Sequence, residues 1–288
     1  MTDTVKDAIT YDGPDRIVHY TDFLAQKSGR SGASHSFKSG FESFDAVCGL
    51  ETGEVVVVTG FTKNGKTLFA ESWIHNIVRA DPSAVAAIFS FEVQTEKLLQ
   101  KYIPSGDIPV FVPLELKTMD FDWLVKRCAE AKYKHHAKIV LIDHLHFLID
   151  MNTQQNMSLN IGAFMRRLKK DIALGLDLAV ILIAHQGQPK EGKEASLSNI
   201  RDSSFVGQES DATIVVSRRA NLNEAELKEV ESRSGAFKAE LLRVAQQGGG
   251  DDKFSGGLAV VKIECHRRTG VFGWRKMFRK NGHWVEEL

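Results

Sequence analysis

The sequence predicts an α/β fold in which a mostly parallel, helix-covered sheet is extended by antiparallel strands near the carboxyl end. Apolar runs of strand length alternate with segments of helical periodicity from residue 37 onward. These runs contain few polar residues, which is typical of parallel strands buried on both faces. After a glycine-rich turn at 248–250, strand-like segments follow one another directly, as antiparallel strands joined by tight turns do.

The bulk composition fits a globular protein and excludes several other classes. The chain has 288 residues, and 43% of them are hydrophobic, which is enough for one large buried core. Lys+Arg and Asp+Glu each total 37, so the net charge argues neither for nor against nucleic acid. The three cysteines are far apart and fit neither a disulfide framework nor a zinc site. With no signal peptide and no apolar run of about 20 residues, we expect a soluble cytoplasmic protein.

The chain divides into an N-terminal arm or linker (1–36) and one large domain (37–288). In the arm, residues 16–26 have the pattern of a short amphipathic helix, and residues 28–34 have the composition of a flexible linker. Two interpretations of the arm stay open, a ragged terminus or a segment that docks on a neighbouring subunit.

Each element of the domain is predicted from its apolar pattern. The parallel strands are expected at 54–59, 85–91, 138–143, 177–184 and 213–217. Helices are expected at 68–79, 95–102, 121–134, 159–174 and, with a more polar sequence, 222–246. The antiparallel strands are expected at 258–265, 270–278 and 283–286.

The turn after the first strand carries the strongest motif, because residues 60–67 read G-x-x-x-x-G-K-T between a strand and a helix. Its glycines allow backbone N–H groups to surround phosphates, and the helix N-terminus adds positive partial charge. Lys66 would reach the β- and γ-phosphates, and the Thr67 hydroxyl would bind Mg²⁺. The expected nucleotide-binding residues are Gly60, Phe61, Thr62, Lys63, Asn64, Gly65, Lys66, Thr67 and Leu68.

Polar residues end the other parallel strands, at the edge where ligands bind in such sheets. Asp143 follows an apolar strand and is the expected Mg²⁺ carboxylate. Glu92 ends the second strand, where a carboxylate can orient and deprotonate an attacking water. His185 or Gln186, at the end of the fourth strand, could sense a γ-phosphate; a packed or surface imidazole is the alternative for His185.

Together these motifs resemble, in order, those of the ATPase domain of hexameric replicative helicases of the DnaB and Twinkle class. That class, which includes related phage primase-helicases, is built on a RecA-like core. The resemblance covers residues 37–288. It rests on the segments 41–45, 53–54, 60–67, 90–92, 141–147, 166–170, 183–185 and 205–212.

The resemblance implies roles for individual residues, with ATP and Mg²⁺ as substrate and cofactor. Glu92 becomes the catalytic base, Asp143 the Mg²⁺ ligand and His185 the phosphate sensor. The family also uses an arginine that reaches ATP held by the adjacent subunit. Arg267 and Arg268 both fit a family spacing, and we prefer Arg267; the alternative for either is a solvated strand arginine.

The same resemblance implies a homo-oligomer, a hexameric ring, with single-stranded DNA threaded through its centre. The loop at 186–194 is the candidate DNA contact, through Gln188, Lys190 and Lys193. Lysine contacts to phosphates carry no sequence preference, as a translocating motor requires. From the residues alone, a flexible surface loop is an equal alternative. Since few residues precede the core, a separate primase, loader or polymerase is a possible partner.

Two functions of different class follow from these residues. The first is an ATP-dependent DNA helicase or translocase that acts in DNA replication. The alternative is a non-unwinding RecA-fold ATPase, either a recombinase-like filament or an ATP-switched loader or regulator, which the phosphate loop, Glu92 and Asp143 fit equally well. A small-molecule kinase is disfavoured because no stretch reads as a lid or an acceptor pocket.

Overall fold

The structure is a computed structural model that describes residues 10–13, 16–18, 20–22, 35–99, 108–149, 157–186, 204–219, 257–280 and 284–286. Residues 1–35 and 36–288 are two separate compact units. The predicted linker at 28–34 and the polar segment at 222–246 lie outside the described residues, as does much of the predicted helix at 16–26.

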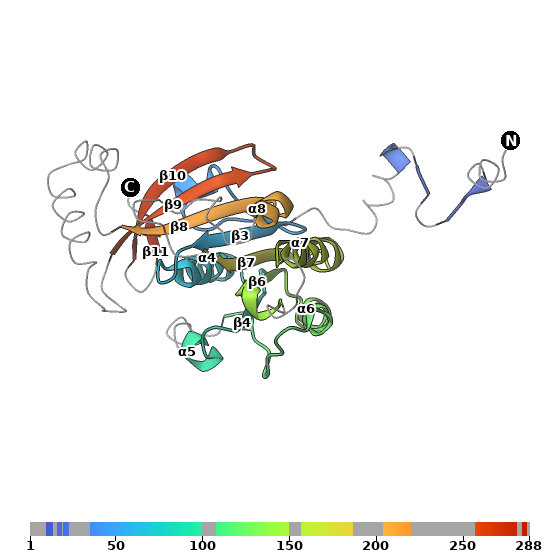
Figure 1. The fold of residues 1–288 in the computed structure, drawn as a ribbon, viewed down its shortest axis with the longest axis horizontal. Coiled ribbons are helices and arrows are strands. Elements are labelled where there is room, and N and C mark those ends of the chain that lie inside the picture. Colours follow the sequence, from blue (N-terminus) through green and yellow to red (C-terminus); the bar gives the residue numbers. More distant parts are fainter. Residues whose placement is uncertain are drawn as a thin grey trace. The chain divides into compact units, whose positions relative to one another are not determined.

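One large sheet organises the second unit. Among the described residues it has nine strands, in the order β11-β10-β9-β8-β3-β7-β6-β4-β5 (Figure 1). The parallel part consists of β3 (Val55–Gly60), β4 (Ala86–Ser90), β5 (Val110–Phe111), β6 (Ile139–Asp143), β7 (Ala179–His185) and β8 (Ala212–Arg219). The antiparallel part consists of β9 (Gly257–His266), β10 (Phe272–Lys280) and β11 (Trp284–Glu286). The predicted fold class is therefore confirmed.

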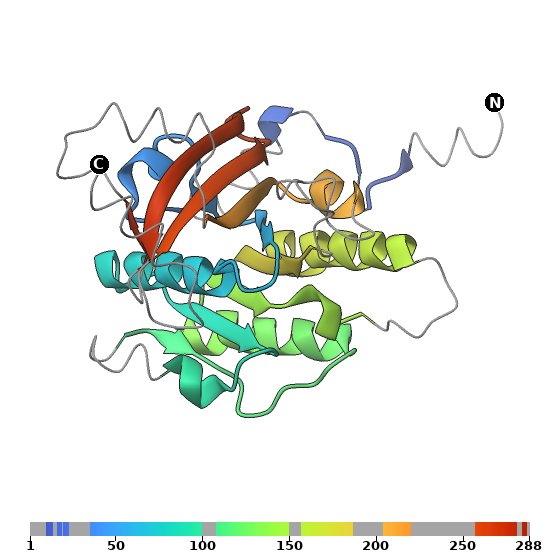
Figure 2. The ribbon, with the colours of Figure 1, turned by 60° about the vertical axis from the view of Figure 1, so that its left-hand side comes forward.

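The pairing register defines two opposite edges of the sheet, one formed by the carboxyl ends of the parallel strands and one formed by their amino ends. Gly60 at the end of β3 is opposite His185 at the end of β7, and Ser90 is opposite Asp143. Four carboxyl ends are thus side by side at one edge. Since β9 is antiparallel to β8, it ends where β8 begins, with His266 opposite Ala212. The turn between β9 and β10 therefore lies at the other edge (Figure 1), and the two strands lie side by side (Figure 2).

Helices cover both faces of the parallel strands, as the apolar strand sequences require. In β3, Val56 and Val58 belong to one buried cluster, and Val55 and Val57 belong to the other. The first cluster includes α4, and the second includes α6 and α7. The helices are α3 (Glu42–Asp45), α4 (Lys66–Ala80), α5 (Thr95–Leu99), α6 (Phe121–His135), α7 (Met157–Arg167) and α8 (Ser204–Glu209), with a 3₁₀ turn η2 (Leu145–Phe147) and a π-helix η3 (Leu168–Leu174).

The lead-in segment before β3 packs against α4 and the C-terminal strands through aromatic rings. Neighbouring centroids in this cluster are 5.2–6.4 Å apart, close enough for edge-to-face contact. Its members are Phe41, Phe44, Phe69, Trp73, Phe278 and Trp284. A short second sheet, β1 (Ser36–Phe37) with β2 (Leu50–Glu51), borders this segment. The antiparallel strands are therefore part of the core that surrounds α4.

The predicted helix at 159–174 changes type part-way. It is α-helical in α7 and becomes the π-helix η3 at Leu168. Within η3, Lys169 donates to the Gly53 carbonyl at 2.8 Å and to Asp211 Oδ2 at 2.6 Å. Asp211 Oδ2 also accepts from the Val55 amide at 2.7 Å. This helix is thus fastened to the amino end of β3.

Candidate active site at the carboxyl ends of the parallel strands

Residues 60–67 connect β3 to α4 as a compact loop. Gly65 precedes the helix with φ 90°, in the left-handed region that favours glycine. Gly60 has φ 147°, and a Cβ on it would lie 2.1 Å from the Val216 carbonyl oxygen. Both glycines are therefore needed for the chain to turn against its neighbours. The resulting loop presents the N-terminus of a 15-residue helix, which favours an anion.

Lys66 is the first residue of α4, and its side chain folds back over the loop. It is 3% exposed, and its Nζ donates to the Phe61 carbonyl at 3.0 Å. Burial lowers the pKa of Lys66 to about 8, although the carboxylates of Glu92 and Asp143 oppose that shift. The ammonium group is therefore held next to two acids at a position where a bound phosphate would stabilise its charge.

Thr67 and Asp143 form a pair of oxygen donors beside Lys66. The Thr67 hydroxyl donates to Asp143 Oδ2 at 2.9 Å. Asp143 is fully buried, and its Oδ1 has no hydrogen-bond partner among the residues that the structure describes. Burial raises the pKa of Asp143 to about 7, against the hydrogen bond from Thr67. A hydroxyl and a carboxylate with an unused oxygen are donors that suit Mg²⁺, so these residues fit the ion.

Glu92 contacts two histidines from neighbouring strands. Its Oε2 is 3.1 Å from His185 Nε2 and 3.6 Å from His144 Nδ1. The centroids of the two imidazole rings are 4.1 Å apart, and the rings are arranged edge to face. Burial lowers the pKa of His144 to about 3 and also lowers that of His185, so both rings are neutral near pH 7. The structure thus brings Glu92, His185, Lys66 and Asp143 to one edge of the sheet.

Sequence reasoning assigned no role to His144, although the structure places it in this group. The available signal was its position directly after Asp143, at the end of an apolar strand. That signal is weak in a sequence, because a residue after a strand can point in several directions.

The arginines at 267–268 lie at the opposite edge. The Arg267 amide donates to the Asp211 carbonyl at 2.8 Å, and the Asp211 amide donates to the Val55 carbonyl at 2.9 Å. Val55 begins β3, whereas Gly60 ends it. Five residue steps along a strand span about 16 Å. Arg267 is therefore far from the phosphate loop of its own chain.

The two neighbouring arginines have different surroundings. Arg268 forms ion pairs with Glu54 at 2.7 Å and Glu51 at 3.0 Å, and these contacts hold the hairpin against the start of β3. Arg267 is exposed, and its guanidinium has no ion pair with the part of the chain that the structure describes. Of the two, Arg267 is the one available to another molecule.

Comparison with known proteins agrees with this architecture. A family model described as "DnaB-like helicase C terminal domain" matches residues 36–109 and 106–252, well over half of the chain. The chain belongs to this family. Two curated relatives are named "Replicative DNA helicase DnaB". The one from Rhodothermus marinus is 23% identical over 231 residues, and the one from Treponema pallidum (strain Nichols) is 24% identical over 220.

These DnaB relatives are longer proteins. The matches cover 68% and 65% of this chain, but only 24% and 49% of the relatives. Solved structures show the same fold. One described as "ATPase Domain of G40P" superposes with a TM-score of 0.62 at 16% identity, covering 93% of this chain and 97% of the other. A DnaB-like replicative helicase studied with its primase superposes equally well, over 96% of this chain and 69% of its own.

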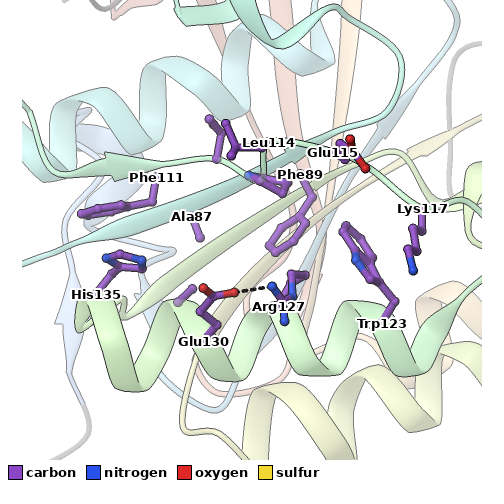
Figure 3. A pocket seen from close by; sticks show the side chains of 13 residues that line it. Ala87, Phe89, Phe111, Leu114, Glu115, Lys117, Trp123, Arg127, Glu130 and His135 are labelled. Carbon is purple, nitrogen blue, oxygen red and sulfur yellow. Dashed lines mark ion pairs between the residues drawn. The ribbon is translucent and has the colours of Figure 1, made fainter.

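The structure does not describe the predicted DNA contacts of this DnaB-like domain, because Gln188, Lys190 and Lys193 lie outside the described residues. A cavity of about 530 Å³ lies between the 110–117 segment and α6, and none of the predicted site residues lines it (Figure 3). Among the described residues, no helix combines the length and apolar character needed to cross a bilayer.

Proposed function

We propose that this chain is the ATP-driven motor domain of a ring-shaped DNA helicase or translocase that acts in DNA replication. One observation carries the proposal: the glycine-rich loop at 60–67 and the exposed Arg267 lie at opposite edges of one sheet. A chain built this way completes its site only when a second copy supplies the arginine. The names of the curated relatives, replicative DNA helicases, support the same function.

At the phosphate-binding edge, the backbone N–H groups of residues 60–67 and the Lys66 ammonium hold the ATP phosphates. Thr67 and Asp143 would hold Mg²⁺, and the bound ion would supply positive charge to neutralise the phosphate oxygens during hydrolysis. The pair already exists as a hydrogen bond at 2.9 Å, so little rearrangement is needed to accept the ion.

Glu92 orients the water that attacks the γ-phosphorus and accepts its proton. The water oxygen bonds to phosphorus, the bond to the bridging oxygen breaks, and ADP leaves with that oxygen. Glu92 is 41% exposed and next to the neutral His185, so it can receive a proton from water. His185, hydrogen-bonded to Glu92, then senses whether the γ-phosphate is present and transmits this to the loop that follows β7.

Arg267 stabilises the transition-state charge on ATP bound to the adjacent subunit. Repetition of this head-to-tail contact closes a ring, which we take to be a hexamer. Single-stranded DNA passes through its centre and contacts Gln188, Lys190 and Lys193. We also propose a primase as a separate partner, on the precedent of the helicase structure described with primase.

Mixed assemblies test the shared site. Arg267→Ala and Glu92→Gln should each strongly reduce ATP hydrolysis in a pure assembly. When the two variants are co-expressed in equal amounts, about one interface in four combines an intact Glu92 with an intact Arg267. We expect hydrolysis to return in the mixture. Failure of the mixture to recover activity would mean that Arg267 does not act on a neighbour's nucleotide.

DNA-stimulated hydrolysis tests the motor. We expect single-stranded DNA to stimulate wild-type hydrolysis, and the double change Lys190→Ala with Lys193→Ala to remove that stimulation. Electron microscopy of the same samples should show closed six-membered rings. Filaments, or hydrolysis that ignores DNA, would favour the recombinase-like alternative.

A further inference from the structure

Glu92, His144 and His185 form a cluster whose ligand atoms all lie within 4.8 Å of one another. They come from the ends of three strands that are adjacent in the sheet, β4, β6 and β7. Both imidazoles face the same carboxylate oxygen, at 3.1 Å from His185 Nε2 and 3.6 Å from His144 Nδ1. Two nitrogens and one oxygen thus converge on one point.

These spacings match those of ligands around one metal ion. Bonds of 2.0–2.2 Å in tetrahedral geometry place neighbouring ligand atoms about 3.3–3.6 Å apart. The separation of 3.6 Å between Glu92 and His144 lies at the upper end of that range, and the separation of 3.1 Å between Glu92 and His185 is slightly shorter. His144 Nδ1 is buried and has no hydrogen-bond partner in the described part of the chain. We propose that Glu92, His144 and His185 bind a divalent transition-metal ion, with Zn²⁺ the best match.

This site is distinct from the Thr67–Asp143 pair in its chemistry. That pair offers only hard oxygen donors, which suit Mg²⁺. Two imidazoles and one carboxylate instead favour Zn²⁺ and similar ions such as Co²⁺, and three protein ligands leave one position open. Within the described ranges, His185 Nδ1 is buried and has no hydrogen-bond partner. In known metal sites, the imidazole nitrogen that does not bind the metal usually donates a hydrogen bond. Since His185 lacks that bond among the described residues, we expect weaker metal binding than at a structural zinc site.

Metal binding at Glu92 has a consequence for hydrolysis, which rests on the function proposed above. The ion would be coordinated by the carboxylate oxygen that accepts the proton from water, so that oxygen could no longer act as the base. Zn²⁺ should therefore inhibit hydrolysis while Mg·ATP is still bound at the phosphate loop.

Cobalt absorption tests the site without any measurement of activity. Tag-free protein without nucleotide is titrated with Co²⁺, whose visible absorption is strong in tetrahedral nitrogen and oxygen coordination. We expect one Co²⁺ per chain, displaced by Zn²⁺ and not by Mg²⁺. His144→Ala and His185→Ala should each weaken binding at least about tenfold, by comparison with losses seen even for groups one shell further out. His135→Ala, a half-buried histidine that stacks on Phe111, is the matched control.

Folding of each variant is checked by circular dichroism, and His185→Gln replaces His185→Ala if that variant does not fold. Co²⁺ binding that survives both histidine changes and is lost in Asp143→Asn would place the ion on the oxygen pair and overturn the proposal, as would the absence of binding. If Co²⁺ binding is lost in both histidine variants but Zn²⁺ does not inhibit hydrolysis, the metal site is supported. The same result contradicts the separate proposal that Glu92 is the base.

Discussion

The two edges of the sheet differ in whether their polar groups find partners within the chain. At the carboxyl edge, Thr67 bonds to Asp143, Lys66 bonds to a loop carbonyl, and Glu92 contacts two histidines. At the amino edge, the β9–β10 turn begins with Arg267, an exposed arginine with no ion pair among the described residues. In the function proposed above, the first edge holds phosphate and metal, and the second offers a charge to a different molecule.

A finer contrast exists within the amino edge. Arg268 forms ion pairs with two carboxylates, whereas Arg267, next to it, is exposed and has no ion pair with the described part of the chain. We therefore propose different roles for these adjacent arginines, stability for Arg268 and function for Arg267. Substitutions can separate these roles, since a loss of activity and a loss of stability should map to different arginines.

Lys66→Ala should have the largest effect, because it removes the cation that we propose to contact the β- and γ-phosphates. We expect hydrolysis to fall to background and ATP binding to weaken strongly, measured by phosphate release and by nucleotide titration. The melting temperature should not fall, since Lys66 is a buried cation whose charge is already disfavoured. Lys97→Ala on the exposed face of α5 is the control. Retained hydrolysis in Lys66→Ala would contradict the phosphate-loop assignment.

Arg267→Ala should lower hydrolysis by the assembled protein by about 10³-fold, the lower end of what arginine fingers contribute. ATP binding and melting temperature should stay near the wild-type values, because the side chain is exposed. Arg275 is also exposed but lies on β10, and Arg275→Ala should leave hydrolysis unchanged. An equal loss in both variants would show a general charge effect and not a finger.

Much of the fold could be predicted because parallel strands buried on both faces have a clear signature. The run at 139–142 is apolar throughout, and every one of its residues is buried. The π-helix η3 could not be predicted, because Leu168 and Ile172 also fit an ordinary α-helical period. The two-residue strand β5 is too short to produce a pattern.

The site could be predicted in part for a related reason. Strand ends fix where Glu92, Asp143 and His185 lie, so topology alone brings them to one edge. Contacts between side chains are not encoded in this way. The ion pair of Arg268 with Glu54 joins residues 214 positions apart, and no local pattern distinguishes Arg268 from Arg267. Only the folded chain shows that Arg268, and not Arg267, forms ion pairs within the described residues.

Arg268→Ala should act on stability. It leaves Glu54, whose side chain is 11% exposed, without its closest ion-pair partner. Because Arg268 is 35% exposed, solvent screens the pair, and we expect a loss of about 1–2 kcal/mol. Removing one partner of a fully buried ion pair lowers the free energy of unfolding by more than this. Chemical denaturation measures the free energy of unfolding, with Arg275→Ala again as control. A stable Arg268→Ala variant without hydrolysis would reverse the assignments of the two arginines.

The smallest effect is expected at Glu286, which joins the last strand to the lead-in segment. Its carboxylate accepts from Lys276 at 2.8 Å and from the Ser43 amide at 3.1 Å. Burial alone would raise the pKa of Glu286, but these hydrogen bonds outweigh it and hold the pKa below its usual value. Glu286→Gln should therefore cost about 1 kcal/mol at neutral pH.

The pH dependence of that cost has a defined sign. A depressed carboxyl pKa contributes stability above the unfolded-state pKa, about 4.3 for glutamate, and loses it as the pH falls through the folded-state pKa. The difference in free energy of unfolding between wild type and Glu286→Gln should thus shrink on acidification below about pH 4. The exposed neighbour Glu42→Gln should show no such trend. A difference independent of pH would mean that the side chain contributes through packing and not through its charge.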